Sequence, residues 1–138
     1  MIFQVFNLKT LLEERGKYIK TEKVVACGHP WYLKIYPRGR SDSIADTEYV
    51  SVYLCYAGTN GQSNPVLAKA NIKTKNIDTN KQFPVTEFSK KTTATTTRGY
   101  GFFDFSPRDK IIKNDCDVAG MLKITEVIEV VVEKRNKW

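Results

Sequence analysis

The chain has 138 residues, a net charge of +7 and 41% hydrophobic residues, values that fit one soluble globular domain and exclude a disordered or fibrous chain. No apolar run approaches the ~20 residues of a membrane span, and the first residues lack the basic start and long apolar core of a signal peptide. We therefore expect an intracellular protein, cytoplasmic or nuclear, that does not engage a membrane. Its lysines are scattered among glutamates, which favours a solubilising role and makes nucleic-acid binding the weaker alternative.

The first segments of the chain are short. Residues 2–8 (IFQVFNL) and 23–27 (KVVAC) are each predicted to form a short strand. Residues 11–16 are too few for a long helix, and Gly16 suits a helix end, so we predict one helical turn there.

Two stronger strand patterns follow, at residues 31–36 and 49–56, joined by a polar connection. Each has an aliphatic side that is expected to face the core, formed by Leu33, Ile35, Val50, Val52 and Leu54. The opposite side carries Tyr32, Lys34, Tyr36, Tyr49, Ser51 and Tyr53. Tyrosine combines a large apolar ring with a hydroxyl and is enriched at protein interfaces, so this side is a candidate contact surface; an ordinary solvated sheet face is the alternative.

The second half of the chain also consists of segments that favour strands. Residues 66–74 favour a strand, although their alanines and lysines also permit a helix. Pro84 interrupts the extended stretch at residues 83–88, which predicts an edge strand. The threonine-rich residues 90–98 are expected to be extended and exposed, with an edge available to an incoming peptide.

The last two patterns complete the fold prediction. Residues 99–105 place aromatic side chains between glycines, and residues 121–134 are rich enough in valine and isoleucine to favour a strand over a helix. Ile128, Val130 and Val132 are expected to face inward. Together these elements predict an all-β fold, an antiparallel eight-stranded β-sandwich, in a single domain over residues 1–138.

Enzymatic and metal-binding roles find little support. His29 is the only histidine and lies in a Gly-His-Pro turn, where a structural or exposed role is expected. Cys27, Cys55 and Cys116 show neither a nucleophile motif nor paired ligand spacing. Gly99-x-Gly101 follows no strand-to-helix phosphate loop and is more simply a bulge or a bend. We expect no catalysis, no metal and no cofactor.

An ordered set of short segments resembles a known family. The segments are FQVFNL at 3–8, WYLKIYPRG at 31–39, YVSVYL at 49–54, YGFFDF at 100–105 and GML at 120–122. In this order, and over nearly the whole chain, they resemble the MATH domain, the meprin and TRAF-C homology fold. The resemblance implies an eight-stranded antiparallel sandwich and a peptide-binding module rather than an enzyme. In the TRAF proteins and the speckle-type BTB adaptor of cullin ubiquitin ligases, a short extended peptide lies across the sheet and beside an edge strand.

The same resemblance implies a set of peptide-binding residues. The family's motifs carry over to Lys34, Tyr53, Arg98, Tyr100 and Phe102, and Tyr36 joins them from the tyrosine-rich side. Ala70 takes the place of a phenylalanine that lines the adaptor's pocket, although alternation groups it with Ile72 toward the core, so a bulge would be needed to aim it at the site.

Two departures from the family change the expected ligand. The aromatic residue at position 100 is commonly tryptophan in the family, and Ala70 would leave a wider, less apolar pocket. We therefore expect a different ligand motif, and the positive Lys34 and Arg98 suggest an acidic or phosphorylated one.

The sequence thus predicts a module that binds extended peptides of partner proteins, as the substrate-recognition domain of a ubiquitin-ligase adaptor when a larger parent supplies a BTB domain. The polar, linker-like residues 133–138 are compatible with such a parent. Two alternatives stay open. One is a basic β-sandwich that binds nucleic acid or an anionic surface, and the other is a structural domain packed against its own parent protein.

Overall fold

The computed structural model describes residues 2–5, 16–39, 48–58, 66–74, 81–88, 99–114, 116 and 121–130. For residues 2–5 and 87 the description covers the backbone and not the side chain. The predicted helical turn before Gly16 and the threonine-rich residues 90–98 lie outside the described residues.

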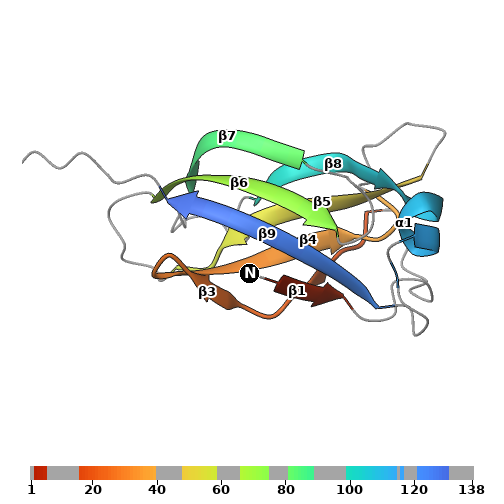
Figure 1. The fold of residues 1–138 in the computed structure, drawn as a ribbon, viewed down its shortest axis with the longest axis horizontal. Coiled ribbons are helices and arrows are strands. Elements are labelled where there is room, and N and C mark those ends of the chain that lie inside the picture. Colours follow the sequence, from red (N-terminus) through yellow and green to blue (C-terminus); the bar gives the residue numbers. More distant parts are fainter. Residues whose placement is uncertain are drawn as a thin grey trace, which may run out of the picture.

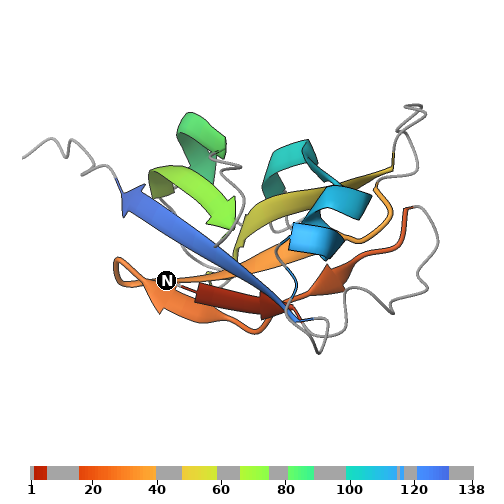
Figure 2. The ribbon, with the colours of Figure 1, turned by 45° about the vertical axis from the view of Figure 1, so that its right-hand side comes forward.

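Two antiparallel sheets pack against each other as the layers of a sandwich (Figure 1). The four-stranded sheet has the order β1 (Ile2–Val5), β9 (Leu122–Val130), β6 (Val66–Thr74), β7 (Lys81–Phe88). The five-stranded sheet has the order β2 (Ile19–Lys20), β4 (His29–Tyr36), β5 (Tyr49–Tyr56), β8 (Gly99–Pro107), with β3 (Val24–Ala26) also paired to β4. The helix α1 (Arg108–Asn114) closes one end of the sandwich, as the rotated view makes clear (Figure 2).

The two shortest strands, β2 and β3, share one edge of β4. β3 pairs with the start of β4, at His29 to Trp31, and β2 pairs with Lys34 and Ile35 near its end. β5 occupies the other edge of β4. β2 and β3 therefore act as one interrupted strand, and the sandwich has the eight strand positions that the sequence predicts.

The core lies between the sheets and is centred on Trp31. The five predicted core residues of β4 and β5 are fully buried, which confirms the alternation in these strands; they are Leu33, Ile35, Val50, Val52 and Leu54. The indole ring of Trp31 contacts the ring of Tyr56 in its own sheet, at 5.3 Å between centroids, and that of Phe88 in the opposite sheet, at 5.2 Å. Its Nε1 donates a hydrogen bond to the carbonyl oxygen of Ala26 at 3.0 Å, so the polar atom of this buried ring is satisfied.

β7 is an edge strand, as the proline within it predicts. Its pairing with β6 shifts by one residue, so that Pro84 and Val85 together oppose Lys69. This bulge places the proline, which lacks an N–H group, where the ladder of hydrogen bonds is already interrupted.

β9 is the last strand, and its inward side chains include a carboxylic acid. Ile128 and Val130 pack against the core as predicted, whereas Val132 lies outside the described residues. Glu126 follows the same alternation and is fully buried on the core side of the strand. Burial raises the pKa of Glu126 to about 8.

Candidate functional site

The outward side of the five-stranded sheet carries a layer of tyrosines and lysines, which we call the tyrosine face. Its members are Tyr18, Lys20, Tyr32, Lys34, Tyr36 and Tyr53. The register places Lys20, Lys34 and Tyr53 side by side across β2, β4 and β5. Because directly opposed residues of antiparallel strands share a face, the outward direction predicted for Lys34 and Tyr53 is confirmed by this pairing.

The rings of the tyrosine face contact one another. Tyr36 lies between Tyr18, at 5.3 Å, and Tyr53, at 5.7 Å between ring centroids, and the second pair meets edge to face. Tyr32 is only 7% exposed although it points away from the core. The tyrosine face is therefore a packed layer of side chains that cover each other, rather than a set of separate solvated residues.

The two lysines of this face each lie within cation–π distance of an aromatic ring, the buried Lys34 and the exposed Lys20 alike. Lys20 and Lys34 are directly opposite in the register, where two like charges would repel. The ammonium of Lys34 lies 4.7 Å from the ring centre of Tyr18, and that of Lys20 lies 5.5 Å from the ring centre of Tyr32. These cation–π contacts run along opposite diagonals, so each charge is stabilised by a ring and the repulsion is reduced.

Tyr100 and Phe102 of β8 point the other way, toward the interior of the sandwich, whereas Phe103 is 52% exposed. Tyr100 is opposite Leu54 and Phe102 is opposite Val52, and both partners belong to the core. Gly101 is the residue opposite Tyr53, so a glycine continues the tyrosine face onto β8. The structure therefore does not place Tyr100 and Phe102 on one surface with Lys34, Tyr36 and Tyr53.

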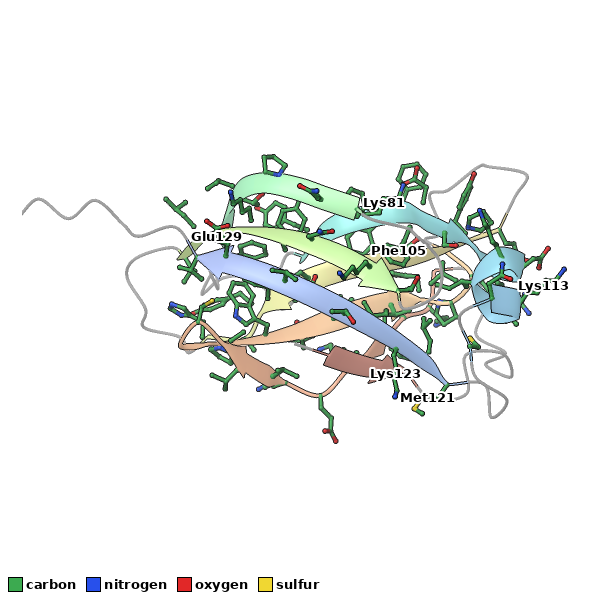
Figure 3. All side chains as sticks on the ribbon, in the orientation of Figure 1. Lys81, Phe105, Lys113, Met121, Lys123 and Glu129 are labelled. Atoms are coloured by element: carbon green, nitrogen blue, oxygen red, sulfur yellow. The ribbon has the colours of Figure 1, made fainter. Side chains whose placement is uncertain are left out.

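Tyr100 and Phe102 belong instead to a cluster at the edges of the two sheets, which we call the edge cluster. Its members are Lys81, Phe83 and Phe88 of β7 with Tyr100 and Phe102 of β8. The rings of Phe88 and Tyr100 are 4.9 Å apart, and those of Phe83 and Phe88 are 6.1 Å apart. The Lys81 ammonium lies 5.7 Å from the ring centre of Phe102, which links the two edge strands; Figure 3 shows Lys81 on β7.

The first part of β8 can lie close to β5 because its residues opposite Cys55 and Tyr53 are Gly99 and Gly101. A side chain at Gly101 would overlap the carbonyl oxygen of Val52 and approach the Tyr53 Cα to 2.8 Å. Both glycines are in regular pairing, so the suggested bulge at Gly99 and Gly101 is wrong. The irregularity comes later in β8, where the Ser51 hydroxyl donates a hydrogen bond to the carbonyl oxygen of Phe103 at 2.6 Å.

Of the two remaining predicted site residues, Ala70 and Arg98, the structure describes only Ala70, which does not lie on the tyrosine face. Ala70 is 3% exposed, lies in the four-stranded sheet opposite Phe83 and Ile128, and faces the core. The bulge that would redirect it is in β7 and not in β6, so Ala70 lies beneath the edge cluster instead of on the tyrosine face. Arg98 lies outside the described residues and stays a prediction.

His29 and Cys55 occupy structural positions, whereas Cys27 is exposed. His29 Nδ1 is 3.1 Å from the Tyr56 hydroxyl, and its ring also contacts Trp31. Burial raises the pKa of the Cys55 thiol to about 11, which keeps it protonated and unreactive near neutral pH. Within the described ranges, no group of three or more histidine, cysteine, aspartate or glutamate side chains is placed to hold a metal ion.

Sequence reasoning missed several members of both groups: Tyr18, Lys20, Lys81, Phe83 and Phe88. Tyr18 and Lys20 lie on a segment whose strand is two residues long, too short for a clear alternation. Phe83 and Phe88 are the two aromatic residues of β7, but they are five positions apart, and only the bulge brings both to the inner side.

The comparisons with known proteins agree with this architecture. None of the helices in the described part of the chain is long and apolar enough to cross a membrane. A search of curated proteins gives no match. The family model of the MATH domain matches residues 1–124, which is most of the chain. The protein therefore belongs to the MATH domain family, whose domains are protein-interaction modules and not typically enzymes.

Proposed function

We propose that the chain binds short, extended peptide segments of partner proteins along β8 and the adjoining tyrosine face. The observation that carries this proposal is the position of β8 at the end of its sheet, where β5 is the one strand paired with it among the described residues. An edge strand offers unpaired N–H and C=O groups to which an extended peptide can add as a further strand.

The side chains on the two sides of β8 fit such a ligand. Alternate residues of an added strand point to opposite sides of the sheet. One set would meet the tyrosine face at Tyr53 and Tyr36, and the other would meet the edge cluster at Tyr100 and Phe102. We therefore expect a peptide with apolar or aromatic residues at alternate positions.

Positive charge on both sides supports an acidic or phosphorylated residue in the peptide. Lys34 lies on the tyrosine face and Lys81 in the edge cluster, and each is within cation–π distance of a ring. A carboxylate or phosphate that reached either ammonium would form a charge-assisted hydrogen bond. With a parent protein that contains a BTB domain, this site would select the substrates of a ubiquitin ligase.

The proposal is tested with a randomised peptide display library. The test variant is Lys34→Gln/Tyr53→Ser, and the matched control is Lys73→Gln/Thr125→Ser, a pair that is adjacent in the register of the four-stranded sheet. Folding of each protein is checked by near-ultraviolet circular dichroism. We expect an extended consensus that the wild type and the control select and the test variant loses.

Other outcomes distinguish the alternatives. Equal enrichment by both variants would place the peptide site away from the tyrosine face. The absence of any enrichment would favour a structural domain whose tyrosine face is covered by another part of its parent protein. Binding to homopolymer RNA that weakens steeply with salt and is lost in the Lys73→Gln control would favour the anionic-surface alternative, because Lys73 is exposed.

A further inference from the structure

The segment that carries Tyr18 crosses the edge of β4 and is fixed at both ends. The Gly16 N–H donates a hydrogen bond to the Gly39 carbonyl oxygen at 2.8 Å. At the other end, the Leu33 N–H donates to the Thr21 hydroxyl at 2.8 Å, and the Thr21 N–H donates to the Leu33 carbonyl oxygen at 3.0 Å. Between these anchors only the two residues of β2 pair with β4.

The ring of Tyr18 lies on the solvent side of Lys34. Tyr18 is 39% exposed, whereas Lys34, whose ammonium is 4.7 Å from the ring centre, is 9% exposed. The ring also contacts Tyr36 at 5.3 Å, which holds it over the lysine. The positive charge that would attract an anionic ligand is therefore covered by an aromatic side chain of the same face.

A covered ammonium can attract an anion at a distance but cannot bind it directly. A charge-assisted hydrogen bond needs the nitrogen and oxygen about 2.7–2.9 Å apart, and a ring placed against the ammonium blocks that approach from its side. Apolar and aromatic peptide side chains meet no such obstacle, because they can pack on the ring itself.

We propose that Tyr18 is a specificity-determining residue of this surface, whose ring covers Lys34 and limits direct contact between the lysine and an anionic peptide side chain. This inference rests on the proposed function, since it takes a peptide as the ligand. At the peptide position nearest Lys34, the wild type discriminates weakly between an acidic residue and its neutral counterpart, and this discrimination increases when the ring is removed.

The cover over Lys34 is tested without any ligand. The chain is treated briefly with acetic anhydride, and the acetylation rate of each lysine is measured by mass spectrometry in the wild type, Tyr18→Ala and Tyr18→Phe. We expect Tyr18→Ala to raise the rate at Lys34 roughly fivefold, the factor that corresponds to a cation–π contact of ~1 kcal/mol. Tyr18→Phe keeps the ring and is expected to stay near the wild-type rate.

Exposed lysines elsewhere serve as internal references in the same samples. Lys69 and Lys110 lie on β6 and α1, away from the tyrosine face, and their rates should not change. An unchanged Lys34 rate in Tyr18→Ala, or an equal increase at Lys69 and Lys110, would overturn the inference, the second result because it indicates general loosening of the fold.

The effect on specificity is measured with a peptide selected by the wild-type chain. Aspartate and asparagine are placed in turn at each position, and phosphoserine and serine likewise, so that carboxylate and phosphate ligands are tested separately. At the position nearest Lys34, we expect the ratio of the aspartate to the asparagine affinity to rise roughly fivefold in Tyr18→Ala and to stay unchanged in Tyr18→Phe. The phosphoserine ratio is expected to follow the same order.

Failure of this inference can be told apart from failure of the proposed function. If peptides bind and acetylation of Lys34 rises, but the affinity ratios of Tyr18→Ala equal those of the wild type, Tyr18 does not set specificity and the proposed function stands. If no peptide binds to any of the three proteins, the proposed function fails, and the inference fails with it.

Discussion

The two sheets bury polar side chains on opposite sides. In the five-stranded sheet the buried charge is Lys34, which points outward and is covered by the rings of its own face. In the four-stranded sheet the outward lysines are exposed, and the buried ionisable group is Glu126, which points into the core. Figure 3 marks Lys123 and Glu129 on β9, two of the outward, exposed residues of this second sheet.

This difference shows that the direction in which a side chain points does not by itself determine whether the side chain is buried. Alternation along a strand fixes direction, whereas burial depends on the size of the neighbours on adjacent strands. Tyrosine rings are wide enough to cover a lysine, and the threonine, lysine and valine side chains of β6 and β9 are not. Lys34 is covered by rings of the outer face, where a substitution can uncover it, whereas the protonation of Glu126 in the core is linked to folding.

The largest expected effect is the pH dependence that Glu126 gives to the free energy of unfolding. Burial raises the folded-state pKa from the ordinary 4.5 of a glutamate to about 8, so the folded chain keeps a proton that the unfolded chain loses between these two values. The group's contribution to the free energy of unfolding is therefore complete below about pH 4.5, decreases as pH rises, and is lost above about pH 8. Relative to Glu126→Gln, which does not titrate, the wild type should lose on the order of 3–5 kcal/mol across this range.

The measurement is urea unfolding of wild type and Glu126→Gln at several pH values, compared as a difference curve. Glu129→Gln is the matched control, because it removes the same charge from the outward, exposed side of the same strand. It should change the free energy of unfolding by less than about 0.5 kcal/mol. Parallel pH curves for wild type and Glu126→Gln would contradict a buried, proton-retaining carboxyl group.

A smaller effect is expected where the tyrosine face reaches β8. Gly101→Ala would force a methyl group against the backbone of Val52 and Tyr53, which cannot move without separating β8 from β5. We expect a loss of about 3 kcal/mol in the free energy of unfolding, measured by urea denaturation. Gly99→Ala meets mainly side-chain atoms, at 2.8 Å from the Cys55 Sγ, and should cost less; the reverse order would contradict the close approach at Gly101.

Local patterns in the sequence were enough to predict most of the fold. The core sides of β4 and β5 follow from a period of two, which needs no knowledge of the partner strand. The edge position of β7 follows from Pro84, since proline lacks the N–H group that a residue of a central strand donates to its neighbour. Glu126 has the same parity as Ile128 and Val130, so alternation alone places it inward, although a glutamate is an uncommon core residue.

The arrangement of the candidate site depends on the register between neighbouring strands, which the sequence of one strand does not determine. Gly99, Tyr100, Gly101 and Phe102 alternate clearly, yet only the pairing of Tyr100 with Leu54 shows that the aromatic side faces inward. Tyr18 reaches Lys34 because a two-residue strand aligns it beside Tyr36, a contact between segments far apart in sequence. For Ala70, alternation with Ile72 indicated the direction that the structure has.

The smallest change in the free energy of unfolding is expected when one side chain is shortened on the outward face of each sheet, which compares the two faces directly. Tyr36→Ala removes a half-buried ring that contacts both Tyr18 and Tyr53, so we expect a loss of about 2 kcal/mol in the free energy of unfolding. Val127→Ala shortens an outward side chain of β9 that is 56% exposed, and its cost should stay below about 0.5 kcal/mol. Urea unfolding of both variants at one pH gives the difference. Equal losses in the free energy of unfolding would mean that the tyrosine rings contribute no more to folding than solvated residues do. The packing of the tyrosine face would then have to come from contacts other than those between its rings.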